Sequence, residues 1–191
     1  MWNFQAQQEA VSFGADTRKI YAMGSSAGAC LALSATRKII LGQSPLSIAS
    51  VKGVVGISPV ALHPNSVPEK YKAEYTAYDQ NASNVPMIDK TTMLQFFDIT
   101  GITSDTKDYF PAADLDCHAR FPPTYICTCE LDPLRDDGKV MIKALHEAGV
   151  KTKSDHYDGM PHNFFVFPGL PETRTFMEQT LAGIQWVIEQ M

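Results

Sequence analysis

The sequence predicts an α/β fold in which a mainly parallel sheet carries helices on both faces. Two observations support this class. Short apolar runs at 18–24, 51–58 and 123–131 have strand character, and helix-forming segments separate them. The run at 51–58, VKGVVGIS, is almost continuously apolar, which is typical of a strand buried on both faces of a parallel sheet. Strands that alternate with helices build sheets of this kind.

Length and composition fit one domain spanning residues 1–191. The chain has 191 residues, of which 45% are hydrophobic. Its 16 basic residues are scattered and its net charge is −5, which argues against a nucleic-acid surface. The N-terminus lacks a basic segment followed by an apolar one, and no run is long enough for a membrane span. We therefore expect a soluble, cytoplasmic protein that acts on a neutral organic molecule.

The N-terminal part contains two helices and two strands. Helical spacing predicts a helix at 3–13, which ends at Gly14, and a strand at 18–24 follows. A helix is expected at 27–41, and after a break the strand at 51–58.

Residues 59–122 form an aromatic, polar and proline-punctuated insertion without strand signals. A capping-box spacing of Ser66 and Glu69 predicts a helix that runs to about Tyr78, and a second helix is expected at 90–98. An insertion this long is usually a lid or a pocket wall; the alternative is a helical excursion that only packs the core. Its aromatic side chains fit either an apolar pocket or extra core: Tyr71, Tyr75, Tyr78, Phe96, Phe97 and Phe110.

The C-terminal part continues the alternation. A strand at 123–131 precedes a helix that begins at Asp136 or Asp137, both of which have the character of N-caps. A strand at about 152–157 and a helix at 172–189 complete the order. The last helix carries one apolar stripe, Phe176, Leu181, Ile184 and Val187.

The segment KIYAMGSSAGAC, residues 19–30, contains a candidate nucleophile. Gly24, Ser26 and Gly28 have the spacing G-x-S-x-G between a strand and a helix. Such a turn places its central serine at a sharp, strained tip with the hydroxyl exposed above the sheet. The spacing therefore selects Ser26 and leaves Ser25 as a neighbour.

A serine hydroxyl needs a base, and the base needs an orienting carboxylate. In open α/β sheets such groups lie on loops at the carboxyl ends of strands. Of the five histidines, His162 alone lies in a loop just after a C-terminal strand, and Asp132 directly follows the strand at 123–131. The order Ser26, Asp132, His162 is that of a hydrolase with a nucleophile, an acid and a histidine.

The four cysteines, Cys30, Cys117, Cys127 and Cys129, are expected to be buried, reduced thiols. The pair at 127 and 129 has no neighbouring histidines and is a poor metal pattern. No cofactor or metal is expected.

Four segments, GSSAGA, PPTYICTCELDPLRDDG, ALHEAGV and YDGMPHNFF, resemble the hormone-sensitive-lipase branch of the α/β-hydrolases, the group with arylacetamide-deacetylase-like enzymes and carboxylesterases. The resemblance implies that Ser26 is the nucleophile, Asp132 the acid and His162 the base. It implies the C-terminal part of an α/β-hydrolase with a helical insertion, and a serine carboxylic-ester hydrolase for small apolar or aromatic esters. Ser25 stands where the family usually has aspartate.

The same resemblance implies two further features. The family has a His-Gly-Gly-Gly loop upstream of the serine that supplies most of the oxyanion hole, and this sequence does not contain it. The Ala27 N–H is then the evident oxyanion donor. The family's sheet also continues beyond the serine strand, so residues 19–24 are expected to form an open edge. Through this edge the chain is expected to pair as a homodimer or to aggregate, or else to be only marginally stable.

Two other functions remain open on the same fold. One is a catalytically silent binding or scaffold protein that lacks the oxyanion loop. The other is a lyase or cyclase, because this scaffold hosts several chemistries. Labelling with a fluorophosphonate separates the silent protein from an enzyme.

Overall fold

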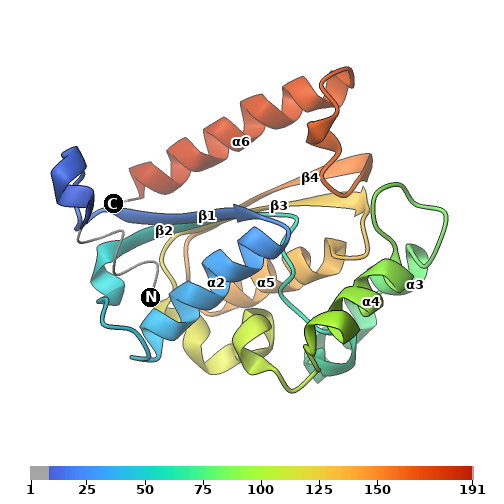
Figure 1. The fold of residues 1–191 in the computed structure, drawn as a ribbon, viewed down its shortest axis with the longest axis horizontal. Helices are drawn as coiled ribbons and strands as arrows, with labels where there is room; N and C mark the ends of the chain where they lie inside the picture. Colours follow the sequence, from blue (N-terminus) through green and yellow to red (C-terminus); the bar gives the residue numbers. More distant parts are fainter. Residues whose placement is uncertain (1–8, 191) are drawn as a thin grey trace.

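Four parallel strands form the centre of the protein in the computed structural model, which describes residues 9–190 (Figure 1). The strands are β1 (Ile20–Ser25), β2 (Val51–Ile57), β3 (Thr124–Leu131) and β4 (Thr152–Pro161). They lie in the order β1-β2-β3-β4, and every neighbouring pair is parallel. The predicted α/β class and parallel sheet are confirmed. The predicted helix at 3–13 lies mostly outside the described residues, and its end, Val11–Phe13, is a 3-10 turn.

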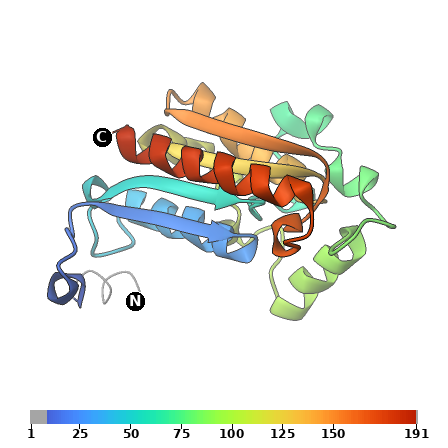
Figure 2. The same cartoon turned by 90° about the horizontal axis from the view of Figure 1, so that it is seen from above.

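Helices cover both faces of the sheet, as expected. α2 (Ala27–Ile40) and α5 (Arg135–Glu147) lie on one face, and α6 (Pro171–Glu189) lies alone on the other (Figures 1 and 2). The α2/α5 face packs on residues such as Val54 and Ile126, whereas the α6 face packs on Val55 and Tyr125. This alternation explains the continuous apolar run of β2, because both faces of that strand are buried.

The helix α6 packs closely against the sheet at Gly183. A Cβ atom at Gly183 would lie 2.6 Å from the ring of Tyr125, so only glycine permits this approach. Phe176 and Val187 are buried beneath the helix, as the predicted stripe requires. Leu181 departs from the prediction, because it is 59% exposed on the outer side of α6.

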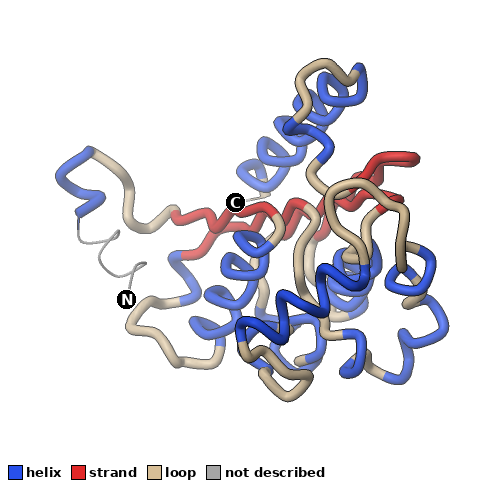
Figure 3. The backbone as a smooth tube through the Cα atoms, turned by 45° about the vertical axis from the view of Figure 1, so that its right-hand side comes forward, coloured by secondary structure: helices blue, strands red, loops and turns tan. Residues whose placement is uncertain are grey.

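The insertion between β2 and β3 contains no strand in the described structure and consists of short helices joined by loops (Figure 3). The predicted helix at 90–98 is confirmed as α4 (Lys90–Thr100), which Asp89 caps by accepting from Thr92 N. The other elements are short: η3 (Pro64–Ser66), η4 (Glu69–Glu74), α3 (Ala77–Gln80), η5 (Lys107–Tyr109), η6 (Pro111–Ala113) and η7 (Leu115–Arg120).

The predicted continuous helix from Ser66 to Tyr78 is wrong. Ser66 ends η3 and its hydroxyl donates to the His63 carbonyl, so it caps no helix. Further along, the backbone amides of Thr76 and Ala77 donate to a carboxylate of α5, which fixes the chain in another path.

Asp136 and Asp137 are not N-caps either. Both lie in the first turn of α5, and Leu134 occupies the cap position without a side-chain hydrogen bond. Their carboxylates contact the insertion, a long-range role that the local sequence pattern does not contain. All four cysteines are free and buried, as predicted. Within residues 9–190, no helix combines the length and apolarity needed to cross a membrane.

Candidate active site

Ser26 lies at the turn between β1 and α2. Its backbone has φ 54° and ψ −121°, a conformation that is strained for any residue other than glycine. The Ser26 N–H donates to the Ile57 carbonyl of β2 over 2.8 Å, which holds the turn against the neighbouring strand. Ser26 therefore lies in a strained strand-to-helix turn at the carboxyl edge of the sheet, as the G-x-S-x-G spacing predicts.

The two glycines of the motif have different roles in the turn. A Cβ atom at Gly24 would lie 2.2 Å from the backbone carbon and oxygen of Gly28, so the strand and the helix meet there without room for a side chain. A Cβ atom at Gly28 would meet no described atom within 4 Å. Gly24 is therefore the residue that permits the sharp turn.

The imidazole of His162 lies between Ser26 and Asp132. Its Nε2 is 2.9 Å from Ser26 Oγ, and its Nδ1 is 2.7 Å from Asp132 Oδ2. A proton on Nδ1 is consistent with this network: Nδ1 then donates to the carboxylate, and Nε2 accepts from the serine hydroxyl. The structure thus brings together all three side chains, which are far apart in the sequence.

Burial and hydrogen bonds hold the carboxylate of Asp132 in place. Asp132 is fully buried, and its second oxygen accepts from the Leu134 N–H over 2.8 Å. His162 is 3% exposed and follows β4, which is longer than predicted and extends to Pro161. The Ser26 hydroxyl is the accessible end of this hydrogen-bonded chain, so the arrangement can pass a proton from a serine to a histidine.

Ala27 is the first residue of α2, where the backbone N–H has no partner within the helix. Helix N-termini also carry a partial positive charge. The predicted oxyanion donor is therefore next to Ser26 at a position suited to bind a developing negative charge.

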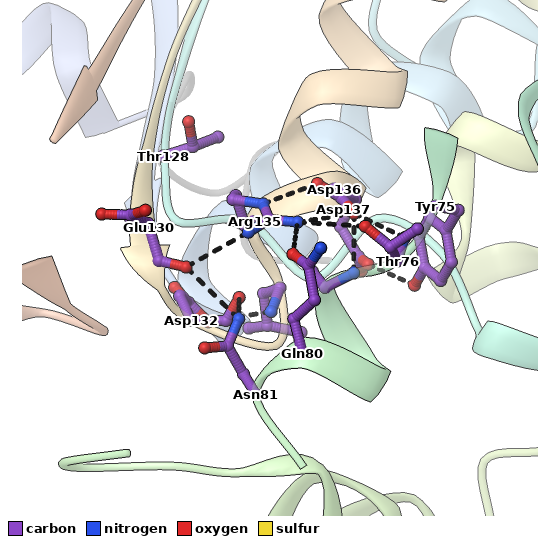
Figure 4. Close-up of polar contacts among 12 residues, drawn as sticks. Tyr75, Thr76, Gln80, Asn81, Thr128, Glu130, Asp132, Arg135, Asp136 and Asp137 are labelled. Atoms are coloured by element: carbon purple, nitrogen blue, oxygen red, sulfur yellow. Dashed lines mark hydrogen bonds and ion pairs between the residues drawn. The ribbon is translucent and has the colours of Figure 1, made fainter. Parts of the chain in front are cut away.

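Two asparagines that were not among the predicted site residues also support the site. Asn163, in the left-handed conformation with φ 53°, accepts a 2.8 Å hydrogen bond from the Ser25 hydroxyl. Asn81 of the insertion donates to the carbonyls of Asp132 and Glu130 (Figure 4). For Asn163, one signal in the sequence was available: asparagine tolerates the left-handed backbone conformation that a tight turn after His162 can require.

A cavity of about 480 Å³ opens beside Ser26 and Ala27. Its walls come from α2, through Cys30 and Leu31, and from the insertion. The insertion contributes mainly apolar side chains: Val60, Ile88, Met93, Phe96, Phe97, Ile102 and Phe110.

The six predicted aromatic residues divide between pocket and core. Phe96, Phe97 and Phe110 line the cavity. Tyr71 and Tyr78 are buried in packing and do not line it. Tyr75 is partly buried and packs against the two core clusters that contain Tyr71 and Tyr78.

Burial shifts the pKa of Cys30, which lines the cavity, and that of His63, which packs behind the wall residues Phe97 and Phe110. Burial raises the pKa of the Cys30 thiol to about 11, and its Sγ donates to the Tyr109 carbonyl over 3.3 Å. Burial lowers the pKa of His63, whose ring packs against Phe97 and Phe110. No group of three or more metal-ligating side chains comes together within residues 9–190.

The fold and this site together define the class of protein. The alpha/beta hydrolase fold family matches residues 1–166. The chain belongs to this family, in the branch that includes hormone-sensitive-lipase-like enzymes, which confirms the resemblance read from the sequence.

Particular relatives carry esterase names. The chain is 46% identical over 186 residues to versiconal hemiacetal acetate esterase of Dothistroma septosporum, and 35% identical over 178 residues to the esterase of the same name from Aspergillus parasiticus. These alignments cover 97% and 90% of this chain but 56% and 54% of the relatives. The chain therefore spans about half the length of these relatives.

The fold is similar to that of the crystal structure of vibralactone cyclase. It superposes with a TM-score of 0.86 at 27% identity and covers 98% of this chain, while this chain matches 55% of that structure.

Proposed function

We propose that the protein is a serine carboxylic-ester hydrolase in which Ser26, His162 and Asp132 act as the catalytic residues. The hydrogen-bonded chain among these three residues, with distances of 2.9 and 2.7 Å, is the observation that carries this proposal. The esterase names of the relatives support it.

In the first step, Ser26 Oγ attacks the carbonyl carbon of the ester while His162 Nε2 takes the hydroxyl proton. The negative charge on the carbonyl oxygen is stabilised by the Ala27 N–H. Asp132 stabilises the imidazolium and keeps the proton on Nδ1. When the tetrahedral intermediate collapses, the carbon–alkoxy bond breaks and Nε2 gives its proton to the leaving alcohol.

In the second step, water releases the acid. His162 Nε2 accepts a proton from the water as its oxygen attacks the acyl carbon, and the bond to Ser26 Oγ breaks. The proton returns to the serine, so the enzyme regains its initial state without a cofactor or a metal.

The cavity indicates esters with an apolar or aromatic part. Its wall contains Phe96, Phe97 and Phe110 beside the nucleophile, and the thiol of Cys30 is neutral. The relatives are named for a hemiacetal acetate, an ester in which the acyl group is the small acetyl group. We propose that this chain hydrolyses acetates of apolar or aromatic alcohols, with the alcohol part in the cavity and with 59–122 as its wall.

Substitution of the site residues tests the proposal. Ser26→Ala and His162→Ala should each lower turnover of phenyl acetate by more than about 10³-fold, because residues that act as a unit fail together. Ser25→Ala, which removes one hydrogen bond to Asn163, should lower it about two- to tenfold. Equal losses at Ser25 and Ser26 would contradict the choice of nucleophile.

A fluorophosphonate separates an enzyme from a silent scaffold. Its phosphorus should bond covalently to Ser26 in the wild type, and Ser26→Ala should abolish the adduct. A wild-type chain that forms no adduct would support the scaffold function instead.

The likeness to vibralactone cyclase favours one second candidate. A cyclase would release the acyl-enzyme by attack of a hydroxyl of the bound acyl group, in place of water, and would form a ring ester. Both reactions release the alcohol, and mass spectrometry of the acyl product distinguishes them, since the free acid is heavier than the ring ester by one water molecule.

A further inference from the structure

Three aspartates that lie close together in the chain connect two different parts of the molecule to one turn. Asp132, Asp136 and Asp137 lie between the end of β3 and the first turn of α5 (Figure 4). Asp132 contacts His162, whereas the other two contact the insertion. The proposed mechanism uses the first of these carboxylates and leaves the other two without a role.

Asp137 binds the start of the insertion. One oxygen of the Asp137 carboxyl group accepts from the N–H groups of Ala61 and Leu62, both over 3.0 Å. The other oxygen accepts from the Tyr75 hydroxyl over 2.6 Å. Asp137 is fully buried, so losing an acceptor here would leave buried donors unpaired.

Asp136 binds the same segment further along the chain. Its Oδ2 accepts from the N–H groups of Thr76 and Ala77, both over 2.7 Å. The guanidinium of Arg135 pairs with its Oδ1 over 2.8 Å and also donates to Gln80 of the insertion (Figure 4). The cation offsets the charge of this buried carboxylate.

These contacts lie next to the cavity. Val60, which lines the cavity, directly precedes the amides that Asp137 holds. Tyr75 stacks on Tyr78, with ring centroids 5.9 Å apart, and Tyr78 packs in one cluster with the cavity residues Phe97 and Phe110. The position of the cavity wall therefore depends on where the two carboxylates hold the backbone.

We propose that Asp136 and Asp137 are positioning residues that anchor the insertion to the turn of Asp132 and so set the place of the cavity wall relative to Ser26. The kinetic part of this inference rests on the proposed esterase function. Because one rigid turn orients His162 and holds the wall, the nucleophile and the cavity keep a fixed geometry.

The test compares variants with two acetates. Phenyl acetate and 1-naphthyl acetate share the acyl group and are both esters of phenols, so a difference between them reports mainly the fit of the alcohol part. In Asp137→Ala and in Asp136→Ala, KM for 1-naphthyl acetate should rise about tenfold while kcat stays within about twofold, as expected when binding alone is lost. KM for phenyl acetate should change less.

A conservative variant and a control distinguish a positioning role of Asp137 from a general effect on the stability of the fold. Asp137→Asn keeps an oxygen that can accept from both amides, so its KM should stay near that of the wild type. Asp155→Ala removes the carboxylate that accepts from the buried Tyr125 on the α6 face, and it should leave both KM values unchanged. A fall in kcat at constant KM in Asp137→Ala would overturn the inference.

Hydrogen exchange provides a readout without catalysis. In Asp137→Ala the amides of residues 61–62, and in Asp136→Ala those of 76–77, should exchange about tenfold faster, with no change across β3. Unchanged exchange at these amides would overturn the anchor itself. If the wild type cleaves neither ester, the esterase function has failed, and the exchange data still decide the anchor.

If Asp137→Ala does not fold, Tyr75→Phe provides a milder test of the same contact. It removes one hydroxyl from the contact and keeps the carboxylate. A rise of about threefold in KM for 1-naphthyl acetate would support the inference. An unchanged KM in both Tyr75→Phe and Asp136→Ala would overturn it.

Discussion

At the scale of the residue, Gly24 determines whether the nucleophile turn forms. A methyl group there would meet backbone atoms of Gly28 at 2.2 Å, and backbone cannot move aside as a flexible side chain can. We expect Gly24→Ala to abolish labelling of Ser26 and to lower the unfolding free energy by about 2 kcal/mol or more. Denaturant unfolding and fluorophosphonate labelling measure the two effects.

Gly28→Ala is the matched control, because a Cβ atom there meets no described atom within 4 Å. It should change the unfolding free energy by less than about 1 kcal/mol, within the range of helix propensity. Equal destabilisation by the two substitutions would contradict the steric account of the motif.

The residues of the site differ in how far the sequence reveals them. Ser26, His162 and Asp132 could be predicted because each follows a strand and because a parallel sheet gathers strand ends at one edge. Asn81 and Asn163 were not predicted, because their roles are hydrogen bonds to residues far away in the chain and neither residue type indicates such a partner.

At the scale of the element, the insertion shows why a local capping pattern can fail. The spacing of Ser66 and Glu69 is that of a helix start, but helix formation needs backbone donors that are free for it. At the C-terminal end of the expected helix, the N–H groups of Thr76 and Ala77 instead donate to the carboxylate of Asp136. At its start, Ser66 ends a separate 3-10 turn. By contrast α4 is capped within its own segment, by Asp89, and its place was predicted.

The burial of Asp137 predicts a pH effect on stability. Burial, more than any other cause, raises the pKa of this carboxyl from 3.8 to about 8 in the folded protein. The folded state therefore favours the protonated form, and this contribution to stability is full below about pH 4 and is lost as the pH rises to about 8. We expect the unfolding free energy of the wild type to fall more steeply between pH 5 and pH 8 than that of Asp137→Asn.

Denaturant titrations at several pH values measure this difference, because the side-chain amide of the Asp137→Asn variant does not titrate and all other groups are shared. Parallel pH profiles for the two proteins would contradict a raised pKa at this position.

At the scale of the whole molecule, β1 lies at one edge of the sheet (Figure 2). Among the described strands it pairs with β2 alone, and none of its six residues is fully buried, whereas six of the seven residues of β2 are. An edge of this kind is a template for pairing with another chain. We expect concentration-dependent self-association, which Met23→Lys weakens because this side chain is 53% exposed on β1.

Sedimentation velocity over a range of concentrations measures the association. Leu181→Lys places the same charge on another exposed apolar position, on the outer side of α6, and should leave the association unchanged. A monomer at every concentration, or equal effects of the two lysines, would contradict pairing through β1.

Because α6 is the last helix in the chain, its position also affects when the folded site can form during synthesis. Every residue of the candidate site precedes this helix in the chain, yet α6 alone covers one face of the sheet in the described structure. A chain that stops before Pro171 should leave Val55, Tyr125 and Tyr157 facing water and should be digested rapidly by protease. As the chain leaves the ribosome, Ser26 emerges before His162 and both emerge before α6, so we expect their contact to become stable only once this last helix has been made.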